Sequence, residues 1–275
     1  MPVEPHAVAD VAAGLANYLE WLKEEDVSRV DVSPKNLAAL RQQPPLVPVS
    51  PAQFKPERAP AQPPIVKPTR PRPHPMSGTD DEVTHQLGTL ALTLAACKQC
   101  ALHQSRAQVV SGQGLTRQPL VMFVGESPGE EEDQQGVAFV GEAGRLLTRI
   151  IEAMGLRRDE VFLTNIIKCR PPNSRHPRVA EMERCLPYLR RQIALIRPQV
   201  IVVLGSLAAK ALLNPTEPIS QLRGRWLEFD GIPLMPTFHP NYLLHTPSKK
   251  MEVWADMKQV LSRLGRSPPA RAGHS

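Results

Sequence analysis

The sequence has 275 residues, 41% of them hydrophobic, and contains no apolar run of the length that a membrane-spanning helix needs, so we expect a soluble chain with no membrane partner. Its four cysteines are too few for a disulfide-stapled secreted scaffold, and its N-terminus lacks the layout of a signal peptide, which favours a reducing, intracellular and cytoplasmic location. The net charge of +6 favours a polyanionic partner.

Residues 1–40 form an N-terminal segment with a net charge of −4, from 3 basic and 7 acidic residues. The apolar positions that predict one face of a helix are Val11, Leu15, Tyr18, Leu19 and Leu22. Two interpretations remain open, because a single short helix is rarely stable alone. The helix docks on a protein partner, or it folds back on the rest of the chain.

Residues 41–77 are predicted to form a disordered, basic linker. Of the 30 prolines in the chain, 12 lie between Pro44 and Pro75, and residues 41–77 carry a net charge of +5. Prolines remove amide donors and favour extended backbone, so this stretch should act as a semi-stiff tether. We expect one folded domain over residues 78–265 and a disordered tail over residues 266–275.

Strand and helix patterns alternate within the expected domain. Continuous apolar runs predict strands at residues 120–124, 161–163, 200–204 and 232–238. Helical periodicity predicts helices at residues 146–154, 179–196 and 208–213. This alternation predicts an α/β fold, a three-layer α/β/α domain with a short, mostly parallel central sheet. Ligands bind at the carboxyl ends of such strands, here residues 125–129, 164–165, 205–206 and 238–240.

The four cysteines form one close pair, Cys97 and Cys100, followed much later by Cys169 and Cys185. A gap of two residues lets both sulfurs of a pair reach one metal centre, and four thiolates suit either a zinc ion or an iron-sulfur cluster. Zinc sites usually contain two close pairs, so the spread of the later cysteines favours a cluster.

An acidic loop follows the first predicted strand. It runs from Gly125 through Glu126 and Ser127 to Glu132 and Asp133, and it lacks the Gly-Lys-Ser/Thr of a phosphate-binding loop. Its carboxylates would repel a phosphate. They can instead hold a water molecule or stabilise a developing cation, while some of them simply favour the start of a helix through its dipole.

The motifs together resemble the family 4, iron-sulfur-containing uracil-DNA glycosylases. The resemblance covers roughly Cys97 to Leu261 and rests on the cysteine spacing and on four segments in the family's order: GESPGEEED, VAFVGEAG, LTNIIKCRPP and FHPNYLL. Ser127 and Asn241 depart from the residues usual in the family, which bears on the range of substrates. The resemblance implies a monofunctional hydrolase of base excision repair that releases uracil and leaves an abasic site. It also implies a [4Fe-4S] cluster on the four cysteines.

The resemblance also implies roles for single residues. Asn165 would pair with the edge of a uracil flipped out of the DNA, and Phe139 would stack on its ring. His239 would donate a hydrogen bond to uracil O2 as the glycosidic bond breaks. Gly125 and Ser127 would line the substrate pocket, and Glu126 or Glu132 would orient the water.

A basic segment surrounds the two later cysteines, and we expect it to contact the DNA backbone, in single or double strands. The residues expected there are Lys168, Arg170, Arg175 and Arg178. The protein is expected to be a monomer. Two alternatives remain: a protein that captures uracil-DNA without turnover, as covalent relatives do through a histidine in the loop where His176 lies, or a metal-stabilised module that binds DNA or recruits partners.

Overall fold

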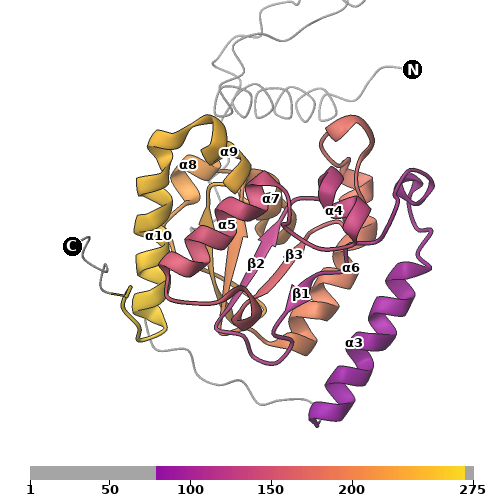
Figure 1. Cartoon of the computed structure of the whole chain (residues 1–275), viewed down its shortest axis with the longest axis horizontal. Coiled ribbons are helices and arrows are strands. Elements are labelled where there is room, and N and C mark those ends of the chain that lie inside the picture. Colours follow the sequence, from indigo (N-terminus) through magenta and orange to yellow (C-terminus); the bar gives the residue numbers. More distant parts are fainter. Residues whose placement is uncertain (1–78, 270–275) are drawn as a thin grey trace, which may run out of the picture. The chain divides into compact units, whose positions relative to one another are not determined.

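The computed structural model describes residues 79–269, which form a mixed sheet of six strands with helices around it (Figure 1). The strands are β1 (Gln113–Gly114), β2 (Val121–Gly125), β3 (Phe162–Asn165), β4 (Val200–Leu204), β5 (Leu227–Phe229) and β6 (Ile232–Thr237). The α-helices are α3 (Asp80–Ala95), α4 (Glu130–Gln135), α5 (Glu142–Ala153), α6 (Val179–Ile196), α7 (Ser206–Leu213), α8 (Ile219–Leu222), α9 (Pro240–His245) and α10 (Lys250–Arg263). Short 3-10 turns are η2 (Ala101–Gln104), η3 (Arg158–Glu160), η4 (Pro172–Ser174) and η5 (Pro247–Lys249).

The strand order is β1-β3-β2-β4-β6-β5, and the four inner strands are parallel. All residues of β2, β3 and β4 are buried, as expected for strands covered on both faces. The predicted mostly parallel sheet is therefore confirmed. The antiparallel edge strands β1 and β5 were not predicted, because they are only two and three residues long.

Helices cover both faces of the sheet and complete three layers. The connections β3-α6-β4 and β4-α7-β6 run along the sheet in the opposite direction to β2-α5-β3, so the usual right-handed crossover would put α5 on one face and α6 and α7 on the other. Contacts join α5 to α9 on the first face and α6 to α7 on the second. Helix α3 packs against α6 outside the sheet (Figure 1). The predicted α/β/α fold is confirmed, and the helices that were not predicted are α3, α8, α9 and α10.

Two of the predictions from sequence concern parts of the chain that lie outside the described residues: the N-terminal helix with its linker, and the tail beyond residue 269. By its internal contacts the chain divides into residues 1–64 and residues 65–275, and the described residues all belong to the second unit. Among them, no helix is both long and apolar enough to span a membrane.

Candidate active site and cysteine cavity

The predicted site residues lie at the carboxyl edge of the parallel strands. Gly125 is the last residue of β2 and pairs in register with Asn165, the last residue of β3. Farther along the same edge of the sheet, Leu204 of β4 pairs with Thr237 of β6, which lies two residues before His239. The sheet therefore brings the sequence-predicted residues of three separate segments to one edge.

Gly125, Asn165 and Phe139 form the innermost part of this site. A methyl group at Gly125 would lie 2.5 Å from Asn165 Oδ1 and 2.6 Å from Phe139 Cζ, so only glycine leaves the space between them. Asn165 is 2% exposed, and its Oδ1 has no hydrogen-bond partner within residues 79–269. A buried acceptor without a partner is costly, which indicates a place for a ligand that donates a hydrogen bond.

Phe139 is held in an unusual backbone conformation. Its φ is +55°, in the left-handed region that residues with a side chain rarely adopt. Gly144 makes this possible, because a methyl group there would overlap the carbonyl of Phe139 at 2.0 Å. The Phe139 ring lies 6.3 Å from the His239 ring, centroid to centroid, with the two planes 32° apart. The loop thus presents an aromatic face beside the histidine.

The carboxylate of Glu132 fixes this loop. Its Oε1 accepts hydrogen bonds from the amides of Val140 and Gly141, both at 3.0 Å, and its Oε2 accepts from the amide of Gly129, also at 3.0 Å. Glu132 is buried, and these three amides occupy its carboxylate. Of the two carboxylates predicted to orient water, the geometry therefore favours Glu126.

Glu126 lies directly after β2 and is partly exposed. Its Oε1 is 2.7 Å from Nδ1 of His176, which reaches back from the loop before α6. The sequence placed His176 in this loop, but it contains no signal for a contact between residues 50 positions apart. Ser127 follows Glu126 and is half-buried.

His239 caps the N-terminus of α9, where its Nδ1 accepts a hydrogen bond from the amide of Asn241 at 3.1 Å. In the neutral ring the proton therefore sits on Nε2, which is left to donate. The ring is partly exposed, yet the surrounding protein desolvates it and lowers the pKa of His239, while Glu126 and Glu132 oppose this by their charge. Gly205, at the end of β4, packs against the side chain of His239.

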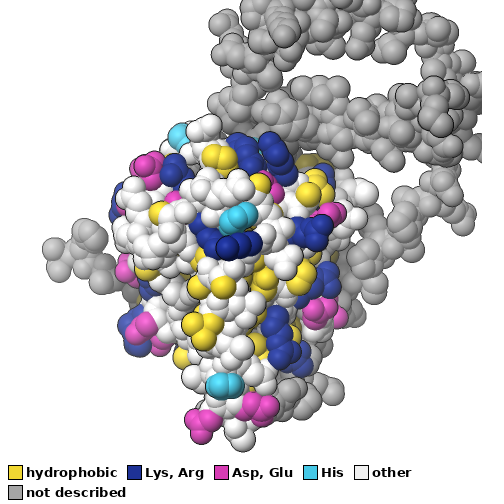
Figure 2. All heavy atoms as spheres, turned by 90° about the vertical axis from the view of Figure 1, so that its right-hand side faces the viewer, with side chains coloured by type: hydrophobic (Ala, Val, Ile, Leu, Met, Phe, Trp, Pro, Cys, Tyr) yellow, Lys and Arg dark blue, Asp and Glu magenta, His cyan; other side chains and the backbone are white. Residues whose placement is uncertain are grey.

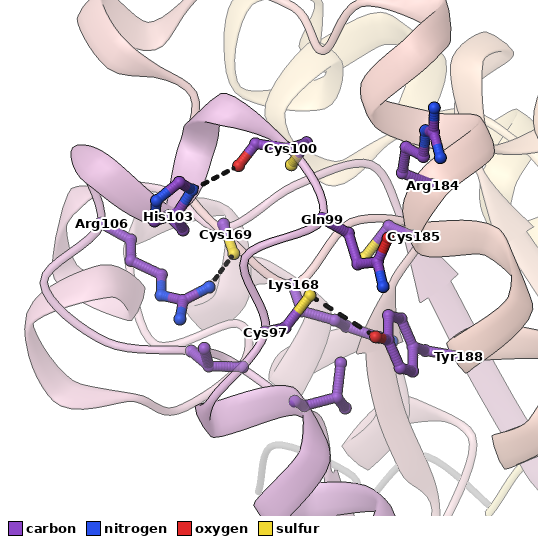
Figure 3. Close-up of a pocket in the computed structure, with 12 residues that line it drawn as sticks. Cys97, Gln99, Cys100, His103, Arg106, Lys168, Cys169, Arg184, Cys185 and Tyr188 are labelled. Atoms are coloured by element: carbon purple, nitrogen blue, oxygen red, sulfur yellow. Dashed lines mark hydrogen bonds between the residues drawn. The ribbon is translucent and has the colours of Figure 1, made fainter.

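The four cysteines line one cavity between the η2 loop, the segment after β3 and helix α6 (Figure 3). No group of three or more His, Cys, Asp or Glu side chains in the described part of the chain has the geometry to hold a metal ion. The thiols have polar neighbours: Arg106 Nη1 donates to Cys169 Sγ at 3.1 Å and Tyr188 Oη donates to Cys97 Sγ at 3.5 Å. Burial raises the pKa of Cys185 to about 11, while the charge and main-chain N–H of Lys168 oppose the rise.

The prediction that Lys168 contacts the DNA backbone is wrong, because its side chain is 1% exposed and lies in the interior. The other three basic residues lie at the surface. Arg170 pairs with Glu130 at 3.1 Å, and Arg175 binds the carboxylate of Glu181 with both terminal nitrogens, at 2.6 and 2.8 Å. Arg178 is exposed. Figure 2 shows groups of Lys and Arg side chains over the side of the domain where α3 lies in Figure 1.

The sequence reasoning missed a second charged group behind the site. Asp256, on α10, is fully buried and accepts hydrogen bonds from Thr237 Oγ1 at 2.6 Å and from Arg223 at 2.6 and 3.1 Å. The only signal for it was an acid on the apolar side of a helix that was not predicted.

Residues 112–258 match the model of the Uracil DNA glycosylase superfamily, which is more than half of the chain. A type-4 uracil-DNA glycosylase of Archaeoglobus fulgidus is 38% identical over 66% of this chain and 96% of that protein. Those of Sulfurisphaera tokodaii and Thermotoga maritima are 42% and 43% identical, over 60% and 56% of this chain and 79% and 81% of theirs. The chain therefore belongs to the uracil-DNA glycosylase superfamily, among the type-4 uracil-DNA glycosylases.

Proposed function

We propose that this glycosylase excises uracil from DNA with Asn165 as the residue that recognises the base, Phe139 as its stacking partner and His239 as the group that stabilises the departing uracil. The observation that carries the proposal is the buried, unpartnered Oδ1 of Asn165 beside the space kept open by Gly125.

Recognition follows from the chemistry of the amide. Asn165 can accept from uracil N3–H through Oδ1 and donate to O4 through its amino group, whereas cytosine offers the reverse pattern. A site that pairs with polar edges rejects the wrong base by about 10⁴ to 10⁵, because its own groups would stay unpaired. Phe139 contributes about 1 to 3 kcal/mol by stacking and adds little base specificity.

Bond cleavage needs opposite charges at the two ends of the breaking bond. The bonding electron pair leaves with uracil and places negative charge on O2, where Nε2–H of His239 donates. The sugar becomes cationic, and the Glu126 carboxylate would stabilise that cation and orient the water that attacks C1′. The attacking water bonds to C1′ and gives up one proton to solvent, the departing uracil anion takes up one proton from solvent, and the DNA keeps an abasic sugar.

The donor set of the cysteine cavity suits an iron-sulfur cluster, although the side chains of residues 79–269 are not arranged to hold a metal ion as they stand. Four soft sulfur donors surround one cavity, and cationic or hydroxyl groups lie next to three of them, as an anionic cluster requires. Cys97, Cys100, Cys169 and Cys185 would hold a [4Fe-4S] cluster, whose contribution is to tie the η2 loop, the segment after β3 and α6 together. Arg170, Arg175 and Arg178 lie near this segment in the sequence and would follow the DNA backbone.

One assay tests the activity. Incubation of the full chain with a uracil-containing oligonucleotide should release uracil and leave an alkali-labile abasic site. A complex that resists denaturant would instead indicate covalent capture, and no change would leave only DNA binding. In anaerobically purified protein, iron and acid-labile sulfide should each be near four per chain. A fully active preparation with stoichiometric zinc and no iron would contradict the cluster.

A further inference from the structure

Lys168 is a buried cation between the base pocket and the cysteine cavity. Its side chain is 1% exposed, and its Nζ donates to the main-chain oxygen of Asn165 at 2.7 Å and to Thr164 Oγ1 at 2.5 Å. Both acceptors belong to the last two residues of β3. The ammonium therefore holds the strand end that carries Asn165 through two hydrogen bonds.

Lys168 also belongs to the wall of the cysteine cavity, where Figure 3 shows it among the sulfurs. It forms no ion pair with a carboxylate among residues 79–269, and its hydrogen-bond acceptors are neutral oxygens. A buried ammonium is costly unless a negative group compensates it, and the four cysteine sulfurs of the cavity would be the negative groups at hand once they ligate a cluster as thiolates.

The strand end is held from its other side as well. Thr164 Oγ1 lies 3.3 Å from the carbonyl oxygen of Ser111 and 3.4 Å from Gln192 Oε1, and Gln192 Nε2 donates to the same Ser111 carbonyl at 2.6 Å. Lys168 thus completes a closed set of polar contacts around the end of β3. Within that set it is the member that also faces the cysteines.

We propose that Lys168 is a positioning residue that couples the cysteine cavity to uracil recognition, holding the main chain of Asn165 while its charge is balanced by the thiolates. The coupling rests on the proposed role of Asn165. A misplacement of about 1 Å at a recognition group can lower the rate by about 10². Loss of the hydrogen bonds from Lys168 to the end of β3 should therefore change the rate measurably.

The test uses the full chain, purified anaerobically, with Lys168→Met, Thr164→Val and, as a matched loss of an exposed lysine, Lys258→Met. Three quantities are measured: the ratio of affinities for uracil- and cytosine-containing oligonucleotides, the single-turnover rate of uracil release, and the reduction potential of the cluster. Thr164→Val removes an acceptor of the ammonium without changing any charge.

Lys168→Met should narrow the affinity ratio, slow uracil release by about 10- to 100-fold and make the reduction potential more negative, because a nearby cation stabilises the added electron. Thr164→Val should narrow the ratio less and leave the potential unchanged, and Lys258→Met should match the parent in all three. A Lys168→Met protein with parental ratio and rate overturns the coupling, even if its potential shifts. Where Lys168→Met does not fold, a parental ratio in Thr164→Val overturns it.

Asn165→Asp separates this inference from the function on which it rests. If Asn165→Asp loses the preference for uracil while Lys168→Met keeps it, the coupling is wrong and the recognition role stands. If Asn165→Asp keeps the preference, the recognition role of Asn165 is wrong as well.

Discussion

The ends of β3 and β6 are held by buried charges of opposite sign. At β3, Lys168 grips the main chain of Asn165 and has only neutral acceptors among the described residues. At β6, Asp256 accepts from Thr237 and is paired with Arg223, so the charge is balanced within the fold. At the strand end proposed to recognise uracil, the charge of Lys168 therefore depends on the cysteine sulfurs for compensation. At the strand end that carries His239, the charge of Asp256 is compensated by Arg223.

The largest expected effect separates chemistry from recognition at these two ends. His239→Ala should lower single-turnover cleavage by about 10² to 10³ and leave affinity for uracil-DNA nearly unchanged, since its hydrogen bond strengthens as charge develops. Asn165→Asp should instead weaken the preference for uracil, because an ionised carboxylate offers no donor to O4. Rates and affinities are measured for both. An equal loss of rate and affinity in His239→Ala would make His239 a binding residue.

The second prediction concerns the pH dependence of stability at the end of β6, where Asp256 is paired with Arg223. Burial raises the pKa of Asp256 to about 6, against the opposing effects of Thr237 and Arg223. The folded state thus holds this proton more tightly than the unfolded state, whose carboxyl ionises near its ordinary value of about 3.9. Asp256 therefore contributes stability that is complete below pH 4 and is lost as the pH rises through about 6, roughly 3 kcal/mol in the free energy of unfolding.

Asp256→Asn removes this contribution, so the free energy of unfolding of the variant should fall less than that of the parent between pH 4 and pH 7. At pH 4 the Asp256 carboxyl of the parent is protonated, so Arg223 lacks a charged partner in both proteins and their free energies of unfolding should be similar there. Denaturant unfolding at several pH values measures both. The control Asp230→Asn, at an exposed turn, should follow the parent curve. A difference between parent and Asp256→Asn that stays constant with pH would contradict the assignment.

Substitutions in the loop that carries Phe139 should have smaller effects on stability and cleavage. Glu132→Gln replaces a carboxylate that accepts three amide hydrogen bonds, and should cost about 1.5 to 3 kcal/mol of stability with slower cleavage, because Phe139 loses its support. Glu131→Gln is the neighbouring control, since Glu131 is half-exposed and makes only a 3.4 Å ion pair with Arg145. Equal effects in the two variants would show that the amide contacts carry no special weight.

The smallest effect is expected from deleting residues 1–77. Uracil release from a short oligonucleotide should stay within about twofold of the full chain, because every proposed catalytic residue lies beyond Gly125. Affinity for long DNA should fall at low salt and converge with the full chain as salt rises, since the linker carries +5. A truncated protein that keeps its cluster but cannot cleave would place the N-terminus in the active site.

The sequence allowed the parallel core to be predicted because β2 and β4 are continuous apolar runs, and the residues after them could be assigned to one edge. It did not allow Lys168 to be separated from its basic neighbours. A lysine side chain is expected at the protein surface, and only the packing of the folded chain shows that Lys168 is buried. The pairing of Glu126 with His176 and the three amides on Glu132 likewise depend on contacts that periodicity does not encode. The Asp230-Gly231 dipeptide between β5 and β6, with φ of +48° and +78°, is typical of a tight hairpin turn, and this sequence signal alone indicates the antiparallel pair.

The three amide hydrogen bonds accepted by Glu132 have a consequence for the entropy of binding. One side chain joins Gly129 to Val140 and Gly141, closing the intervening residues into a loop without any covalent bond. The freedom of that loop is given up once, during folding, rather than at each encounter with DNA. In its proposed role, Phe139 would meet the flipped base as a rigid surface, so the free energy of stacking would go into holding the base and not into ordering the protein.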